Sequence, residues 1–485
     1  MFDIHGWIEF KDPNNLMTRP IKPLLQCGAM LCLFYFVTFM VMYMASSGEY
    51  RPDARFAHAR FIMLILLSPI LFKYLIQLTT ALFYSLVEKT RFINSHLVDK
   101  NKVSVLIPAW NEEVGILKTL NSVINTDYPE LEIIVINDGS TDKTHQLVSN
   151  FIQDYERTPH QANTPVIKYL KLPNGGKAKA LNQGLCIATG EIVLTVDADS
   201  VMDKKMIANI VKRFTDEKVA AVAGNVVVGN RKKPIELLQQ LEYLHGFWFK
   251  RADSNFNSVH VIGGAAAAYR KAILEEVGGF DENIITEDVE LSVRLLAMGY
   301  ATRYAADAVV YTEGPSEWKC LCSQRLRWKF GRLLTYIKHR SLFFSLSKKH
   351  HPYLTCLVLP VAIYAELALF LEALLLTIFY GYTIYTGDYI PLAFMVCFVS
   401  AIITLQVLFD SKMKFHANLL ILAPVAWLMF YVIDLVEFQA LCRSMHRLVK
   451  RENLEWQTWA RVGIISQAVA RQVNHSRVVT EHKSI

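Results

Sequence analysis

The sequence has few of the features that mark disulfide-rich, zinc-binding or nucleic-acid-binding proteins. Only eight of its 485 residues are cysteine. Cys320 and Cys322 lack partners at zinc-ligand spacing, so we expect reduced thiols. The net charge is +7 at pH 7, yet no motif combines basic and base-stacking aromatic residues. We therefore expect no nucleic-acid partner.

A Walker phosphate-binding loop is also absent. Gly175, Gly176 and Lys177 precede a predicted helix, but the G-x-x-x-x-G-K-[ST] spacing is missing. Backbone amides at a helix N-terminus favour phosphate, and Lys177 would add positive charge. A simple glycine turn followed by two solvated lysines is an equally good interpretation.

Apolar residues, in contrast, are abundant and gathered in long runs. They make up 52% of the chain. Five runs approach or exceed the roughly 20 residues that cross a bilayer, at residues 24–44, 61–87, 354–380, 390–409 and 419–441. The first run starts late and is too long for the apolar region of a cleavable signal peptide. We expect a multi-pass integral membrane protein.

Charged residues give partial information on topology. The polar insert between the second and third runs is rich in Lys and Arg, which favours the cytoplasmic side. Simple alternation of five spans places the C-terminal tail outside. Arg443, Arg447, Lys450 and Arg451 follow the last run and favour an inside tail. Five charged residues also interrupt the runs, and such groups usually face a bundle interior or a water-filled path: Lys73, Glu366, Glu372, Asp434 and Glu437.

Within the insert, short apolar runs alternate with helical periodicity. The pattern predicts strands at residues 103–109, 133–137, 167–172, 192–196, 221–228 and 265–269. This alternation is typical of a mostly parallel sheet with helices on both faces. In such sheets ligands bind at the carboxyl ends of the strands. Asp138, Asp197 and Asp199 all fall at predicted strand ends.

Two acidic motifs suggest chemistry. The carboxylates of Asp197 and Asp199 leave a strand two residues apart and could share Mg²⁺ or Mn²⁺ with diphosphate oxygens. The competing interpretation is an acidic turn that caps the next helix. Thr286 is a predicted N-cap, and Asp288 behind it is a candidate general base, because a helix N-terminus keeps a carboxylate ionised. Capping alone is the competing interpretation here too.

Residues 318–339 form a basic helical stretch that contains Gln324-Arg325-Leu326-Arg327-Trp328. Taken alone, it predicts an amphipathic helix lying on the bilayer surface. Arg325 or Arg327 could also bind diphosphate, and Trp328 could stack on a sugar ring.

Together these motifs resemble the processive, membrane-integrated family 2 glycosyltransferases, such as cellulose, hyaluronan, chitin and poly-N-acetylglucosamine synthases. The resemblance rests on six motifs. In chain order they are P-A-W-N-E-E at residues 108–113, D-G-S, G-K-A, D-A-D, T-E-D and Q-x-x-R-W. The last motif is the most specific. The resemblance implies an α/β, Rossmann-like GT-A domain on the cytoplasmic side, inserted between α-helical transmembrane segments. It also implies inverting transfer from a UDP-sugar.

The resemblance further implies roles for individual residues. Asp199 would ligate Mg²⁺ or Mn²⁺, and Asp288, with Glu287 beside it, would deprotonate the acceptor hydroxyl. The nucleotide-sugar would be bound by Pro108, Asn111, Glu112, Asp138, Lys177, Asp197 and Arg327. The acceptor would be bound by Gly263, Gly264, Gln324 and Trp328.

The predicted organisation has five parts. Residues 1–87 hold two spans, 88–317 the catalytic domain, 318–350 the interfacial helix, 351–442 the remaining spans, and 443–485 a basic tail. Only about forty residues follow the last span, so we expect no PilZ-like domain after it, which makes a cellulose-type synthase a weaker alternative. The chain most resembles the poly-β-1,6-N-acetylglucosamine synthases of biofilms.

Alternatives stay open at this point. Hyaluronan and chitin synthases are close, and single transfer to a lipid-linked acceptor or a non-enzymatic export scaffold are more distant. The expected partners are a UDP-sugar, a growing polysaccharide and the lipid bilayer of the plasma (inner) membrane. The interpretation leaves room for a small accessory membrane subunit.

Overall fold

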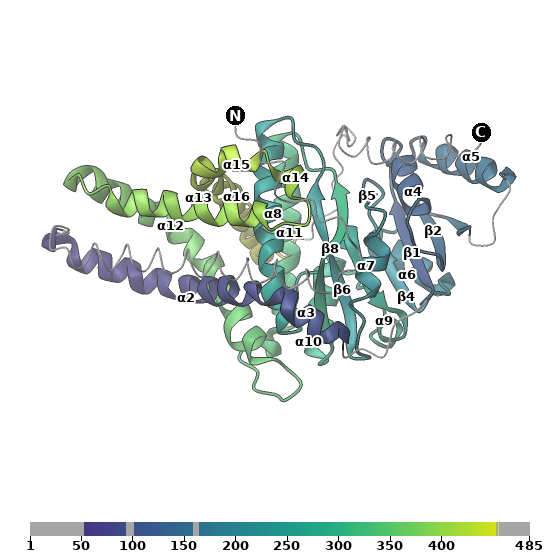
Figure 1. Ribbon diagram of the computed structural model, residues 1–485, viewed down its shortest axis with the longest axis horizontal. Coiled ribbons are helices and arrows are strands. Elements are labelled where there is room, and N and C mark those ends of the chain that lie inside the picture. The colour runs from purple at the N-terminus through teal and green to yellow at the C-terminus, as the bar shows by residue number, and fades with distance from the viewer. Residues whose placement is uncertain (1–52, 94–100, 159–163, 453, 455–485) are drawn as a thin grey trace.

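The computed structural model describes residues 53–93, 101–158, 164–452 and 454. A β-sheet covered by helices forms one end of the molecule, and long helices project from the other (Figure 1). The first predicted span, at residues 24–44, lies outside the described residues.

The sheet has eight strands in the order β3-β2-β1-β4-β7-β6-β8-β5. Strands β3, β2, β1 and β4 are parallel, as are β6 and β8, whereas β7 runs antiparallel to β4 and β6, and β5 antiparallel to β8. The predicted parallel arrangement is therefore correct for one half of the sheet, and the other half is mixed. The bounds are β1 Val103–Ala109, β2 Leu131–Asp138, β3 Val166–Leu172, β4 Ile192–Thr195, β5 Val201–Met202, β6 Val219–Val228, β7 Ala267–Arg270 and β8 Ala301–Thr312.

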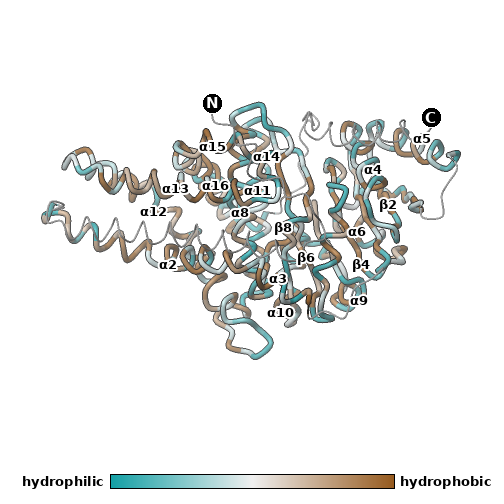
Figure 2. Tube along the Cα trace, in the orientation of Figure 1, coloured by the Kyte–Doolittle hydropathy of each residue, from teal (hydrophilic) through white to brown (hydrophobic). Residues whose placement is uncertain are grey.

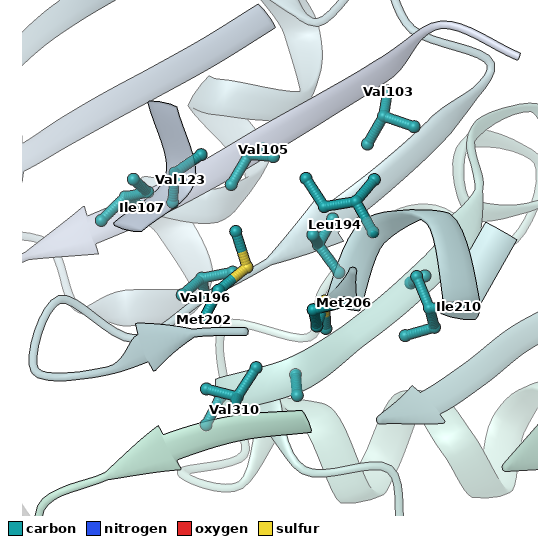
Figure 3. Packing of buried hydrophobic residues seen from close by; sticks show 14 of the residues in the cluster. Val103, Val105, Ile107, Val123, Leu194, Val196, Met202, Met206, Ile210 and Val310 are labelled. Atoms are coloured by element: carbon teal, nitrogen blue, oxygen red, sulfur yellow. The ribbon is translucent and has the colours of Figure 1, made fainter. Parts of the chain in front are cut away.

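Helices cover both faces of the sheet, which is why its central strands are continuous apolar runs. On one face, Val103, Val105 and Ile107 of β1 pack toward apolar side chains of α4 and α7 (Figure 3). On the other face, Leu106 of β1 packs with apolar residues of α6, α9 and α10. The bounds are α4 Ile116–Ile124, α5 Thr144–Arg157, α6 Lys177–Ile187, α7 Met206–Val211, α9 Lys271–Glu276 and α10 Glu287–Ala297.

Four helical segments of the described chain are long and apolar enough to cross a membrane. They are Ala54–Leu82, Tyr353–Thr386, Ile390–Leu408 and Leu419–Lys450, and their helices are brown along much of their length in Figure 2. These four correspond to the second to fifth predicted runs. The helical elements in them are η2 Ala54–Phe56, α2 Ala57–Leu82, the π-helix η5 Tyr353–Val358, α12 Leu359–Thr386, α13 Ile390–Leu408, α15 Leu419–Leu422, η6 Ala423–Val425 and α16 Ala426–Lys450. Because α16 continues to Lys450, Arg443 and Arg447 extend this helix.

Two long helices, α8 (Pro234–Asn255) and α11 (Trp318–Lys338), lie between the sheet and the apolar helices (Figure 1). Helix α8 packs against α2, β6 and β8, and α11 packs along α16. The helix predicted at residues 318–339 is thus present. However, the side chains of Arg325 and Lys329 are only 5% and 4% exposed and pair with carboxylates of other helices. Much of its positive charge therefore faces protein and not a bilayer surface. The shorter helices outside the sheet and the spans are α3 Tyr84–Ile93, η3 Gly264–Ala266, η4 Arg340–Leu342 and α14 Met413–His416.

A close contact between α10 and α11 depends on Gly331. A Cβ atom at this position would lie 2.2 Å from Oγ1 of Thr286, the residue before α10. We expect Gly331→Ala to destabilise the protein by about 1–3 kcal/mol, because overpacking outweighs the gain in helix propensity. Thermal unfolding in detergent measures this. Gly246→Ala in α8 is the matched control, since no atom lies within 4 Å of its Cβ. An equal effect of both substitutions would contradict the packing argument.

Candidate active site

A lysine whose side chain is 17% exposed connects three elements at the carboxyl edge of the sheet. Lys177 is the first residue of α6. Its Nζ lies 2.6 Å from Oδ1 of Asp197, which follows β4, and 3.3 Å from Oε1 of Glu287, which opens α10. The competing interpretation of Asp197-Ala198-Asp199 as a cap of the helix that begins at Met206 is wrong, because the N-cap residue of that helix is Lys205.

The same contacts shift the titration of both partners. Burial alone would lower the pKa of Lys177, but the carboxylates of Asp197, Glu287 and Asp288 outweigh burial and raise it. Burial raises the pKa of Glu287 to about 7, with Lys177 opposing and Asp288 adding to the shift. Lys177 therefore stays charged at neutral pH, while Glu287 is poised between its two protonation states.

Asp288 is held by backbone amides. Its Oδ2 accepts a hydrogen bond from the Gly264 amide at 2.7 Å, and its Oδ1 accepts one from the Val289 amide at 2.8 Å. Thr286 occupies the N-cap position of α10, as predicted, but its hydroxyl makes no capping hydrogen bond. The carboxylate of Asp288 is thus fixed by the loop that carries Gly264, which Thr195 of β4 anchors through a 3.0 Å bond to the Gly264 carbonyl.

Asp199 lies in the turn that follows β4, and its carboxylate could ligate a cation. Its Oδ1 accepts hydrogen bonds from the hydroxyls of Ser200 at 3.1 Å and Thr312 at 3.4 Å. Within the described part of the chain, no group of three or more His, Cys, Asp or Glu side chains converges on one point. This donor set fits Mg²⁺ or Mn²⁺, which one or two carboxylates can hold together with substrate phosphate oxygens and water.

The residues predicted around the nucleotide form a neighbouring group at the ends of β1 and β2. The carboxylate of Asp138 accepts hydrogen bonds from the amides of Gly175 and Gly176, at 2.8 and 2.9 Å. The glycine-turn amides, expected to bind phosphate, therefore already hold an anion of the protein itself. Asn111 has φ +56°, and its Oδ1 accepts a 2.8 Å hydrogen bond from the Thr141 amide.

Pro108 lies on β1 itself, half-buried near its end. The Glu112 amide, just after β1, donates to the hydroxyl of Thr144 at 2.9 Å. Both therefore lie at the same edge of the sheet as Asp138.

A cavity of about 680 Å³ brings the acidic motifs and the α11 motif together. The predicted site residues that line it are Lys177, Asp197, Asp199, Gly263, Gly264, Glu287, Asp288, Gln324, Arg327 and Trp328. Pro108, Asn111, Glu112 and Asp138 do not line it. The Oε1 atom of Gln324 is buried without a hydrogen-bond partner among the described residues, as expected for a group that awaits a ligand.

Helix α8 supplies site residues that sequence reasoning missed. Glu242, Tyr243 and Lys250 line the cavity, and Lys73 and Tyr74 of α2 line it at the side of the apolar helices. Burial lowers the pKa of Lys250 to about 8, with Asp253 and Asp288 opposing. The only signal in the sequence was the aromatic and acidic content of α8, which is ordinary for a buried helix.

The architecture and the site define a class of protein: a GT-A-like α/β domain joined to helices that can cross a membrane. Two family models match it. Glycosyl transferase family 2 matches residues 104–278, and Glycosyl transferase family group 2 matches residues 192–433. The chain therefore belongs to the family 2 glycosyltransferases.

Curated relatives share about a third of the matched residues. The probable glycosyltransferase YdaM of Bacillus subtilis is 35% identical over 255 residues, which cover 51% of this chain and 59% of YdaM. A poly-beta-1,6-N-acetyl-D-glucosamine synthase of Staphylococcus epidermidis is 33% identical over 232 residues, and one of Staphylococcus aureus is 32% identical. Each of these two matches covers 47% of this chain and 54% of the relative. The chain thus spans little more than half the length of these relatives.

A solved structure shares the fold. The mannosyltransferase PcManGT from Pyrobaculum calidifontis, in complex with GDP-Man and Mn²⁺, aligns with a TM-score of 0.50 at 20% identity. The alignment covers 81% of this chain and 99% of that chain. At this identity the likeness supports the GT-A-like fold alone.

The position of Gly264 generates a kinetic prediction. A Cβ atom there would lie 2.8 Å from Nζ of Lys177 and 3.5 Å from Oδ2 of Asp288. We expect Gly264→Ala to lower kcat about tenfold or more, because Lys177 can move only by loosening its ion pairs. Gly381→Ala in α12 is the matched control and should cost less, because Gly381 does not line the cavity and no neighbouring atom lies within 4 Å of its Cβ. Equal losses in steady-state sugar transfer would count against this explanation.

The raised pKa of Glu287 makes stability depend on pH. Its pKa is about 7 in the folded protein, against an ordinary value of 4.5, so the folded state binds more protons between these values. Stability should therefore fall as pH rises from about 4.5 to about 7, by on the order of 1–3 kcal/mol. Glu287→Gln should flatten this part of the curve of unfolding temperature against pH. Glu275→Gln, at an exposed position of α9, controls for the loss of one carboxylate, and an identical curve for both variants would refute the assignment.

Proposed function

We propose that this glycosyltransferase transfers sugar from a UDP-sugar to the end of a growing β-linked polysaccharide and moves the product across the membrane. UDP-N-acetylglucosamine is the donor we favour, because two of the relatives described above are named poly-beta-1,6-N-acetyl-D-glucosamine synthases. The catalytic domain would face the cytoplasm, where nucleotide sugars are found, on a multi-pass plasma-membrane protein.

The observation that carries this proposal is the shared cavity. Its walls include the carboxylates of Asp199 and Asp288 from the sheet side and Trp328 from α11. They also include Lys73 of α2 and Glu437 of α16, two helices long and apolar enough to cross a membrane. Such continuity from the acidic cluster to apolar helices is what an enzyme needs if its acceptor leaves through the membrane.

In this mechanism Asp288 takes the proton of the acceptor hydroxyl as it attacks the anomeric carbon. The amides of Gly264 and Val289 hold its two carboxylate oxygens in place, and each oxygen keeps a further lone pair that can accept the proton. Arg327 would bind the diphosphate, while Lys177 holds Asp197 and Glu287 in position. Gln324 and Trp328 would orient the terminal sugar of the acceptor.

A divalent cation fits this site. A Mg²⁺ or Mn²⁺ ion held by Asp199 and the diphosphate oxygens would neutralise charge on the departing nucleotide. The mannosyltransferase with the related fold is described in complex with Mn²⁺. Assays with Mg²⁺ alone and with Mn²⁺ alone would show which ion supports the higher activity.

Product length tests processivity. Purified protein would be incubated with labelled UDP-N-acetylglucosamine, UDP-glucose or UDP-glucuronate in turn. We expect long polymer from UDP-N-acetylglucosamine, because the cavity retains the acceptor between transfers. A product extended by a single sugar would overturn processivity, and polymer only from another donor would reassign the sugar.

The assignment of the base has its own test. Asp288→Asn should lower transfer about 10²–10⁴-fold while leaving the affinity for the UDP-sugar little changed. Asp307→Asn, outside the cavity and paired with Arg213, is the matched control for loss of an aspartate. Equal rates of UDP release by the Asp288 variant and the unmodified enzyme would reject Asp288 as the base.

A further inference from the structure

Helix α8 holds one arginine of α11 in a fixed orientation. Nη1 and Nη2 of Arg325 lie 2.6 and 2.7 Å from Oε1 and Oε2 of Glu242, so the guanidinium and the carboxylate meet through two parallel hydrogen bonds. The Arg325 side chain is only 5% exposed. A buried two-pronged contact of this kind fixes the plane of the guanidinium as well as its position.

The fixed guanidinium lies over Trp328. Its central carbon is 4.4 Å from the centroid of the indole ring. Tyr243, the neighbour of Glu242, lies beside the same ring at a centroid distance of 6.3 Å and an interplanar angle of 38°. Arg325 therefore covers one face of Trp328, and a pyranose ring cannot stack on that face.

We infer that Glu242 is a positioning residue for the acceptor subsite. It acts through Arg325: the carboxylate holds the guanidinium over one face of Trp328 and thereby restricts where the terminal sugar can contact the ring. The inference rests on the proposed function, in which Trp328 stacks on the acceptor. It assigns Glu242 no contact with the reacting atoms.

A purely structural role is the competing explanation, and the fold allows the two to be separated. Helix α11 is tied to other helices independently of Glu242, because Lys329 lies 2.7 Å from Glu366 of α12 and 2.6 Å from Glu437 of α16. Loss of the Glu242 carboxylate leaves these contacts in place. Glu242→Gln should therefore fold. Arg325 would stay near Glu437 but lose its two-pronged contact with the carboxylate at position 242.

The first experiment measures kinetics on the full-length enzyme in lipid nanodiscs. The acceptor is an oligosaccharide of β-linked N-acetylglucosamine, and the variants are Glu242→Gln and Arg325→Lys. We expect both to raise KM for the oligosaccharide about tenfold and to change KM for the UDP-sugar less than about twofold. Arg325→Lys keeps the charge but lacks the planar fork, so it should behave like Glu242→Gln.

The matched control is Glu366→Gln. Glu366 belongs to the same cluster of charges and contacts Lys329 and Arg332, whereas the ion pairs of Arg325 within the described chain are with Glu242 and Glu437. It should leave KM for the oligosaccharide within about twofold of the unmodified value. Equal increases in all three variants, or equal effects on donor and acceptor KM, would reduce Glu242 to a structural residue and overturn the inference.

A second readout does not depend on activity. Acrylamide quenching is measured for each protein with Trp328 present and with Trp328→Phe, and the difference isolates the Trp328 contribution. In Glu242→Gln, Arg325 no longer stays over the indole, so Trp328 should become about twofold more accessible to the quencher. An unchanged value would overturn the inference. Failure of the unmodified enzyme to extend any oligosaccharide would instead count against the proposed function, with the quenching result still deciding the role of Glu242.

Discussion

The ammonium group of Lys177 is the centre on which the rest of the catalytic edge depends. It connects α6, the end of β4 and the start of α10 through Asp197 and Glu287. Three carboxylates, those of Asp197, Glu287 and Asp288, lie near enough to affect its pKa. Without a cation between them these groups would repel one another, and a buried lysine without them would lose its charge. The lysine therefore offsets the repulsion between the carboxylates, and the carboxylates keep the lysine protonated.

Other features of the site follow from this arrangement. Gly264 has no side chain because Lys177 occupies the space where a Cβ would project. The same residue uses its amide to fix Asp288, so the loop at residues 263–266 approaches both the lysine and the candidate base. The position of the base is thus set by backbone groups and buried charge, which cost little reorganisation during a reaction.

Sequence reasoning was accurate where the fold is local and apolar. Strands β1, β2, β3, β4, β6 and β7 were predicted within a few residues. The first five are rich in β-branched residues and are bounded by turns. The twelve-residue strand β8 was missed, since its alanines and Asp307 resemble neither a buried nor an alternating strand. Its presence, and the antiparallel β7, made the sheet mixed. These pairings join segments far apart in the chain, and no local pattern reports them.

The candidate site was predictable in the same uneven way. The motifs at Asp197, Asp288 and Trp328 named residues that one cavity brings together. The pairing of Asp138 with the glycine-turn amides was not foreseen, because a carboxylate at a strand end and a free helix N-terminus each suggest a ligand when considered separately. In the structure each satisfies the other.

The cavity has a sheet side and a helix side. The first could be predicted from the sequence and the second could not, because they are formed by different kinds of element. The sheet side stands on strand ends, where position along the chain fixes which side chains meet. The helix side stands on α8, α11 and α16, where contacts depend on how helices pack. There three cations, Arg325, Lys329 and Arg332, meet three carboxylates, Glu242, Glu366 and Glu437. Removal of one partner from such a cluster leaves a charge with less compensation. Because Glu437 lines the cavity from α16, a helix that can cross a membrane, this side of the cavity is formed jointly by the α/β domain and the apolar helices.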